Sequence, residues 1–299
     1  MAFISCNMRS RTPASSWRAT SCKHADFAIF SVAMLFGFDY SGSMKQTAFS
    51  LVELSIVLVI LGLLTGGILS GQALITSAQL RGTTTEYSKW VTVVQTFRDK
   101  YFALPGDMAN AQSFWGVAHA TPATCVTTAS TSPLTCNGDG NGQINVSTGS
   151  NESFRFWQHL ANAGLIEGTY TGVAATATTW ARSTANSPSG KFSPSLWYTS
   201  YWGTRGAASS YPPATYDNAL FFGLSTGGDE GGDKVYTPEQ AWNLDTKMDD
   251  GMALTGKIMP RYYRDCTTAT TSGATADKTN TYVLSKTTVE CAPVFMQAF

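Results

Sequence analysis

A short polar stretch that begins at Asn137, with the sequence NGDGNGQI, carries oxygen-bearing side chains at alternate positions around glycines. It resembles the start of a calcium-binding loop, because Ca²⁺ takes about six to eight oxygen ligands in flexible geometry. The predicted ligands are the side chains of four residues and one backbone carbonyl, that of Gln143: Asn137, Asp139, Asn141, Gln143 and Glu152. Thr148 stands where such a loop usually has its last glutamate, so Glu152 would act through a longer loop. A plain turn rich in Asn and Asp explains the same residues, and both interpretations stay open.

Residues 223–227 read GLSTG, which matches the G-x-S-x-G turn that presents the nucleophilic serine of α/β-hydrolases. That turn needs a helix directly after its serine, here Ser225, whereas the glycines at 227–232 oppose a helix. After residue 48 the chain has only His119 and His159 as candidate bases. The sequence therefore favours a loop over a catalytic serine and predicts no enzyme.

We assign no chemical role to two further acidic motifs. Gly227–Glu230 spell GGDE, as in nucleotide cyclases, but Gly231 stands where those enzymes have Phe, so we interpret the motif as a flexible turn. Asp245, Asp249 and Asp250 lie near a lysine at the end of an expected helix. We interpret them as a solvated helix end in preference to a second oxygen cluster.

One carboxylate, Glu53, lies at the start of a long apolar segment. From Leu54 to Leu80 the chain has no charged residue, and about 20 apolar residues are enough to cross a bilayer as a helix. A cleavable secretory signal would end in a small-residue cleavage site after a shorter apolar stretch, whereas this segment continues into a helical pattern. The sequence therefore predicts a membrane-spanning helix, in which Glu53 needs a partner or a position among the lipid headgroups.

The helical pattern continues beyond the apolar segment to about Ala103. Apolar residues recur at helical spacings from Leu74 through Trp90 to Tyr101, and Pro105 then stops the helix. At a rise of about 1.5 Å per residue, some 50 residues would extend roughly 80 Å. The first half is apolar on all sides and the second half along one stripe, which predicts a part in lipid followed by a part packed on a globular domain.

The residues before the apolar segment are more specific. Ala48, Phe49 and the following SLVEL, which contains Glu53, closely resemble the leader junction of type IV prepilins and type II secretion pseudopilins, with Ala48 in place of the usual Gly. Two further stretches look like segments of large pilin-like proteins: FRDKYFALPGDMANAQSFW at 97–115 and LDTKMDDGMALTG at 244–256.

This resemblance implies a bacterial filament or pseudopilus subunit. A membrane-embedded prepilin peptidase would cut between Ala48 and Phe49, and the new amine of Phe49 would be N-methylated. The Glu53 carboxylate would then neutralise the amine of a neighbouring subunit, since buried opposite charges tolerate a membrane only when paired. The implied partners are other pilin or pseudopilin subunits, the peptidase and the bacterial inner membrane, which the chain crosses once with its N-terminus in the cytoplasm. Assembly would carry the globular part into a periplasmic or cell-surface filament.

The resemblance also sets the expected domains. Residues 1–48 are the leader, 49–104 the membrane and assembly helix, and 105–299 an extracytoplasmic globular domain. Translation is expected to begin at Met44, because MKQTA is a short polar leader, whereas residues 1–43 do not have the pattern of a leader. The mature length looks more like a minor pilin or an atypical pseudopilin than a major pilin.

Four cysteines fall in the expected extracytoplasmic part, at Cys125, Cys136, Cys266 and Cys291. Thiols on the far side of a membrane oxidise, which predicts two disulfides. Free thiols or a metal site are the alternatives, but there is no CxxC spacing and no histidine beside the cysteines. Short loops close at lower entropic cost, so Cys125 is expected to pair with Cys136, and Cys266 with Cys291.

The globular part is predicted to be α+β, with the long helix laid across a small antiparallel sheet. Polar low-complexity stretches at 117–150 and 167–193 are expected to be loops. One helix is expected at Glu152–Ala163, closed by the next glycine. Another is expected to start at a capping box on Thr237 and to end at Gly251.

Strands are predicted from aromatic, roughly alternating segments. These lie at Leu196–Trp202 and Ala219–Leu224. Val283, Val289 and Val294 predict a C-terminal strand pair.

Composition suits an extracytoplasmic protein and argues against nucleic-acid binding. Only 13% of residues are charged, the formal net charge is zero and no run of Lys or Arg occurs, whereas a phosphate backbone needs a basic stripe. The favoured function is a structural subunit of a type IV pilus or type II secretion pseudopilus. A membrane-anchored extracytoplasmic hydrolase using Ser225 and an adhesin at a filament tip are the alternatives.

Overall fold

The computed structural model describes seven stretches of the chain: residues 50–147, 150–175, 181–205, 214–224, 234–261, 263–269 and 280–299. The leader, the expected cleavage bond between Ala48 and Phe49, Ser225 and the GGDE motif lie outside these described residues. The chain divides into two units, Met1–Leu61 and Gly62–Phe299. The described part of the first unit is helical from Leu51 on. Helix α2 begins there and continues into the second unit, to which all the other elements below belong.

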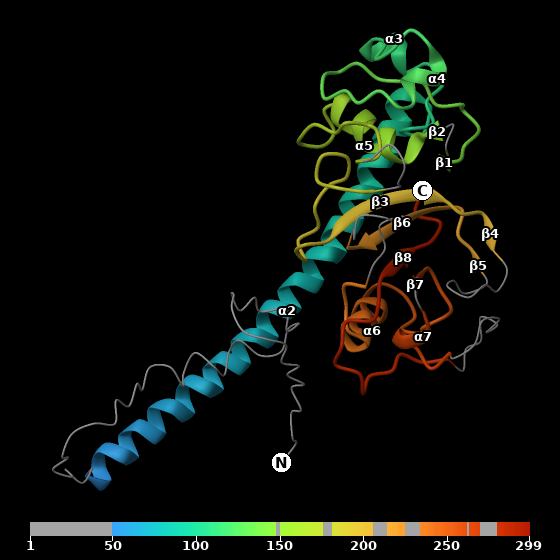
Figure 1. Cartoon of the computed structure of the whole chain (residues 1–299). Helices are drawn as coiled ribbons and strands as arrows, with labels where there is room; N and C mark the ends of the chain where they lie inside the picture. The colour runs from blue at the N-terminus through green and yellow to red at the C-terminus, as the bar shows by residue number, and fades with distance from the viewer. Residues whose placement is uncertain are drawn as a thin grey trace, which may run out of the picture. The chain divides into compact units, whose positions relative to one another are not determined.

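Helix α2 (Leu51–Tyr101) is drawn in blue to teal in Figure 1 and ends close to the predicted limit. Its N-terminus is capped by Ser50, whose Oγ accepts the Val52 N–H at 3.3 Å and whose own N–H donates to Glu53 at 2.9 Å. At the other end Phe102 adopts a left-handed conformation with φ 53° and donates its N–H to the carbonyl of Arg98 at 2.8 Å. Both ends of the helix are thus closed by local hydrogen bonds.

The side chains of α2 change character along the helix. From Leu51 to Ser70 every side chain is exposed, and α2 is long and apolar enough to cross a membrane. One face of the second half is instead buried, through Leu80, Thr83, Glu86, Trp90, Val94 and Phe97.

A four-stranded antiparallel sheet has the order β3–β6–β8–β7. Its strands are β3 (Leu196–Tyr201), β6 (Asn218–Gly223), β8 (Pro293–Phe295) and β7 (Ile258–Pro260). β3 and β6 pair along their whole length, whereas β8 pairs with β6 and β7 through two and three residue pairs. The predicted α+β class and antiparallel sheet are confirmed. The predicted C-terminal strand pair is wrong, because Val283 and Val289 lie outside strands and only Val294 belongs to one.

Alternation along the strands creates two cores. Trp197, Phe222 and Phe295 point to one face of the sheet, where Tyr87 of α2 stacks on Phe295 with ring centroids 4.5 Å apart. Tyr198 and its neighbours on the other face build a second, smaller cluster. One face of the sheet therefore carries the second half of α2, as Figure 1 shows.

The remaining elements are short. The helices are α3 (Ala111–Trp115), α4 (Pro122–Cys125), α5 (Glu152–Asn162), α6 (Pro238–Met248) and α7 (Tyr263–Cys266). Two small hairpins are β1 (Val146–Ser147) with β2 (Ser150–Asn151), and β4 (Thr204–Arg205) with β5 (Ala214–Thr215). The stretch at 117–150, expected to be loop throughout, thus contains α4, β1 and the first residue of β2 in its described part.

The caps of α5 and α6 follow their sequences. After α5, Gly164 has φ 71° and donates to the carbonyl of Ala161, while Leu165 donates to that of Leu160, which is the Schellman arrangement. Thr237 and Gln240 form the predicted capping box of α6.

Two disulfide bonds lie in the described chain, with the pairing expected from the short loops. Cys125 is bonded to Cys136, with Cα atoms 5.8 Å apart. Cys266 is bonded to Cys291, with Cα atoms 5.1 Å apart. Each bond closes a polar stretch that has few apolar side chains to anchor it.

Candidate functional site

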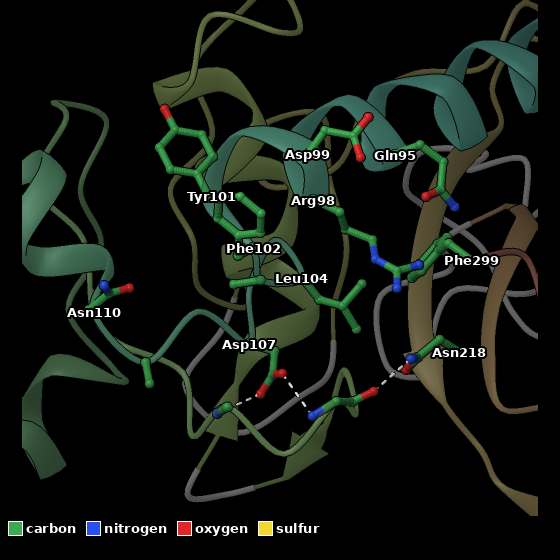
Figure 2. A pocket seen from close by; sticks show the side chains of 14 residues that line it. Gln95, Arg98, Asp99, Tyr101, Phe102, Leu104, Asp107, Asn110, Asn218 and Phe299 are labelled. Atoms are coloured by element: carbon green, nitrogen blue, oxygen red, sulfur yellow. Dashed lines mark hydrogen bonds between the residues drawn. The ribbon is translucent and has the colours of Figure 1, made fainter.

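The NGDGNGQI loop wraps around a carboxylate that lies far from it in sequence. Asp107, in the turn that follows α2, accepts hydrogen bonds from the backbone N–H groups of Gly140 at 2.8 Å, Asn141 at 3.0 Å and Gly142 at 2.9 Å. Figure 2 shows Asp107 in this position. Gly140 and Gly142 have φ of 74° and 82°, a conformation that glycine adopts without strain. The loop glycines thus aim consecutive N–H groups at one carboxylate.

A second carboxylate holds the loop from the other side. Glu152 is the first residue of α5, is buried, and accepts the N–H groups of Asp139 at 3.1 Å and Asn145 at 2.8 Å. Because the helix fixes Glu152, it also fixes the position of Asp139.

Three carboxylates meet at this point. Asp107, Asp139 and Glu152 each offer one oxygen, and these oxygens lie within 4.8 Å of one another. Asp107 and Glu152 are buried, and Asp139 is exposed to solvent. Carboxylate oxygens are the ligands that Ca²⁺ prefers, so these three residues could hold such an ion.

The electrostatics of the cluster leave negative charge unbalanced. Burial, together with the charges of Asp139 and Asp107, raises the pKa of Glu152 to about 7, against the lowering effect of the two N–H donors. Burial likewise raises the pKa of Asp107. Among the described residues, no basic side chain contributes to either shift. A bound cation or a proton would therefore stabilise the cluster.

Of the five predicted calcium ligands, the structure brings together Asp139 and Glu152. The amide oxygen of Asn137 instead accepts the N–H of Gln112 in α3 at 2.8 Å. Asn141 accepts the N–H of Gln143 at 2.7 Å and donates its amide to Asp139 at 2.8 Å. Both asparagine side chains are thus engaged within the loop and its neighbour helix.

Asp107 was not among the predicted ligands. It falls within the stretch at 97–115 that resembles pilin-like proteins, but no spacing rule connects it to a loop that begins 30 residues later. A loop motif shows only the ligands that it contains itself.

The interpretation of Asp245, Asp249 and Asp250 as a solvated helix end is wrong for Asp245. This residue is fully buried and accepts the Tyr282 hydroxyl at 2.9 Å and the Gly251 N–H at 3.2 Å. Burial raises its pKa to about 7. The three oxygens lie close enough to hold an ion, but their hydrogen bonds already close the turn after α6.

The disulfide loop 125–136 is held by the polar side of α5. Arg155 donates to the carbonyls of Cys125 at 3.0 Å and Thr128 at 2.7 Å. Gln158 donates to that of Ser130 at 2.7 Å, and Asn162 to that of Pro133 at 2.8 Å. These bonds place the start of the NGDGNGQI loop, called the acidic loop below, next to the helix that carries Glu152.

The two candidate bases for a hydrolase have structural contacts. His159 is fully buried, accepts the Gly106 N–H on Nδ1 at 3.0 Å and has Nε2 3.0 Å from the Thr135 hydroxyl. Burial, together with the charge of Arg155, lowers the pKa of His159 to about 3, so the ring is neutral. His119 accepts the N–H of Thr121 at 3.0 Å.

Glu53 is the second candidate site. It is the one charged residue between Leu51 and Leu80, and its carboxylate accepts the Ser50 N–H at 2.9 Å. Ser50 and Glu53 stand in the S-x-x-E spacing of a capping box, which is a signal that the sequence itself contains. The carboxylate thus has a local structural partner in addition to any role in assembly.

Comparison with protein-family models, with curated protein sequences and with solved structures finds no match to this chain.

Proposed function

We propose that this protein is a structural subunit of a type IV pilus or a type II secretion pseudopilus. In this proposal prepilin peptidase cuts between Ala48 and Phe49, and the subunit then joins a filament through α2. The observation that carries the proposal is the N-terminal part of α2, exposed on all sides from Leu51 to Ser70, apolar, and carrying the single carboxylate Glu53.

The exposed apolar surface of α2 must be shielded from water. Each Å² of apolar surface left in water costs about 25 cal/mol, and the large side chains from Leu51 to Ile75 are half or more exposed with few exceptions. Before assembly, the lipid bilayer shields these side chains, and the chain crosses the inner membrane once with its N-terminus in the cytoplasm. In a periplasmic or cell-surface filament, neighbouring copies of α2 shield them. The partners are therefore other subunits, the peptidase and the membrane.

Glu53 offers a test that separates its two roles. Glu53→Ala removes both the charge and the cap, whereas Glu53→Gln keeps an acceptor for the Ser50 N–H and removes only the charge. If the carboxylate neutralises the amine of a neighbouring subunit, both variants should be cleaved normally and both should fail to enter filaments. Ser55→Ala, which removes a hydroxyl bonded to Val52, is the matched control and should assemble.

The measurements are an immunoblot for processing and a sheared-filament assay for incorporation, in a strain with the assembly machinery. Assembly of Glu53→Gln at the level of the parent would reduce Glu53 to a helix cap and contradict the charge-pairing step. Absence of cleavage at Ala48–Phe49 in the parent would contradict the family assignment itself.

The acidic loop supports a second proposal, that Ca²⁺ stabilises the globular part. Two buried carboxylates favour it, because neither has a basic partner among the residues that the structure describes. Asp107, Asp139 and Glu152 would hold the ion, and the backbone carbonyl of Gln143 and water would complete the shell. The expected affinity is in the extracellular range, with a Kd of about 10⁻⁴ to 10⁻³ M.

The hydrolase alternative rests on Ser225. Loss of an esterase or peptidase activity in Ser225→Ala would support it against the filament proposal. The buried, neutral state of His159 does not favour it.

A further inference from the structure

An open cavity of about 1030 Å³ lies beside the C-terminal end of α2, and Figure 2 draws its lining. Tyr101 is the last residue of the helix, Phe102 and Leu104 lie in the turn after it, and Asn218 and Phe299 come from the opposite side. Its volume is that of a binding site for a ligand of several rings.

Phe102 has an unusual combination of backbone and side chain. Its φ of 53° lies in the left-handed region, where glycine or asparagine normally closes a helix. Its side chain is 93% exposed and so contributes almost no packing. A strained backbone that presents an aromatic ring to solvent, at the rim of a cavity, indicates that the ring contacts something outside the chain.

Three polar side chains of the cavity are free to bind. Gln95, Arg98 and Asn110 line it, are exposed, and make no side-chain hydrogen bond or ion pair within the described chain. In Figure 2 Arg98 reaches from α2 toward the side of the cavity that carries Asn218. All three are planar amide or guanidinium groups, which can engage neighbouring hydroxyls in pairs.

The charges of the lining exclude a strongly ionic ligand. Arg98 is offset by Asp99 on the same helix turn, and the carboxylate of Asp107 is already occupied by three backbone N–H groups. Leu104 is the one large aliphatic residue of the lining, and the other large apolar residues are aromatic. This mix of aromatic rings and planar polar groups suits a ligand with both apolar faces and hydroxyls better than a lipid chain.

The ligand that fits is neutral, rich in hydroxyls, and carries flat apolar C–H faces for an exposed ring. We propose that this cavity binds a neutral oligosaccharide, with Phe102 stacked on one sugar ring and Arg98 and Asn110 hydrogen-bonded to hydroxyls. This binding is independent of filament assembly, because none of these residues belongs to the apolar part of α2.

The test uses the full chain in a phosphocholine detergent, which has no sugar headgroup to compete. Maltohexaose, cellohexaose and chitohexaose are titrated separately and followed by saturation-transfer NMR. At least one should bind with a Kd in the millimolar range, and Phe102→Gly should weaken that binding by about tenfold or more. Glycine suits the left-handed backbone, so this variant should remain folded. Trp242→Ala, which removes an exposed aromatic ring on α6 outside the cavity, is the matched control and should bind like the parent.

Two results would overturn the proposal. One is that no hexasaccharide binds with a Kd below about 10 mM, and the other is that Phe102→Gly binds as tightly as the parent. Sedimentation velocity of the same samples gives the remaining outcome. Self-association that requires Phe102, without saccharide binding, would make the cavity an interface between copies of the chain and would also overturn the assignment.

Discussion

The indole N–H of Trp197 donates a hydrogen bond of 3.0 Å to the carboxylate of Glu86, and this contact joins α2 to the first strand of the sheet. The backbone N–H of Lys191 donates to the same oxygen at 3.1 Å. Glu86 is only 9% exposed. It is therefore a buried acceptor that two donors share, and it fixes how the helix lies against β3.

Glu86→Ala should lower the free energy of unfolding by about 2–4 kcal/mol, because it leaves two buried donors without an acceptor. Glu86→Gln keeps an acceptor and should lose less, about 1 kcal/mol. Urea denaturation of the full chain in detergent measures both. Glu167→Ala removes an exposed carboxylate that makes no side-chain hydrogen bond to any described residue, and it should change stability by less than about 0.5 kcal/mol. Equal losses in the alanine and glutamine variants would show that the acceptor role is not what matters.

Calcium should raise the melting temperature of the chain at millimolar concentration, and magnesium should not. An ion at ten times its Kd adds about 1.4 kcal/mol to the stability of the state that binds it. Asp139→Ala removes the exposed ligand, together with its hydrogen bonds to Asn141, and should abolish the shift, whereas Asp99→Ala should leave it intact. A parent protein that does not respond to calcium would make NGDGNG a plain turn, and a full response in Asp139→Ala would place the ion elsewhere.

The stability of the metal-free protein should depend on pH through Glu152. Its pKa is about 7 in the folded chain and 4.5 when unperturbed, so the folded state binds the proton more tightly. The contribution of protonated Glu152 to the free energy of unfolding is therefore complete below pH 4.5 and is lost as pH rises through 7. Between pH 5 and pH 8, in a chelator, the parent should lose about 2–3 kcal/mol relative to Glu152→Gln. A difference that does not change with pH would contradict the raised pKa, and millimolar calcium should reduce the effect because the ion binds the ionised form.

Phe102→Gly should stabilise the fold by about 0.5–1 kcal/mol, since glycine adopts the left-handed conformation without the steric penalty of a Cβ atom. The exposed ring has almost no packing to lose. Phe102→Ala keeps the Cβ atom and should give no gain, which makes it the control. Thermal denaturation of the two variants compares them directly, and a destabilised glycine variant would mean that the ring packs on the protein after all.

Local signals determined the elements that form within a few residues of chain. The helical periodicity of α2, the capping box at Thr237 and the glycine after α5 all act through hydrogen bonds between residues at most five apart. The strands β3 and β6 were also predictable, because six-residue aromatic segments carry a strong pattern. β7 and β8 have three residues each, which is too few for a recognisable pattern. The strand pair predicted from Val283, Val289 and Val294 was therefore wrong.

The acidic cluster was decided by tertiary structure. The sequence identified Asp139 and Glu152 as candidate ligands, but Asp107 bonds to residues 33 to 35 positions away. That meeting depends on a close approach of two backbones, since a Cβ atom on Gly138 would lie 2.5 Å from the Cα of Asp107. The buried hydrogen bond between Glu86 and Trp197 spans 111 positions and has the same origin. Sequence determines which groups are present and how each short segment folds, whereas the packing of the helix, loops and sheet decides which of these groups meet.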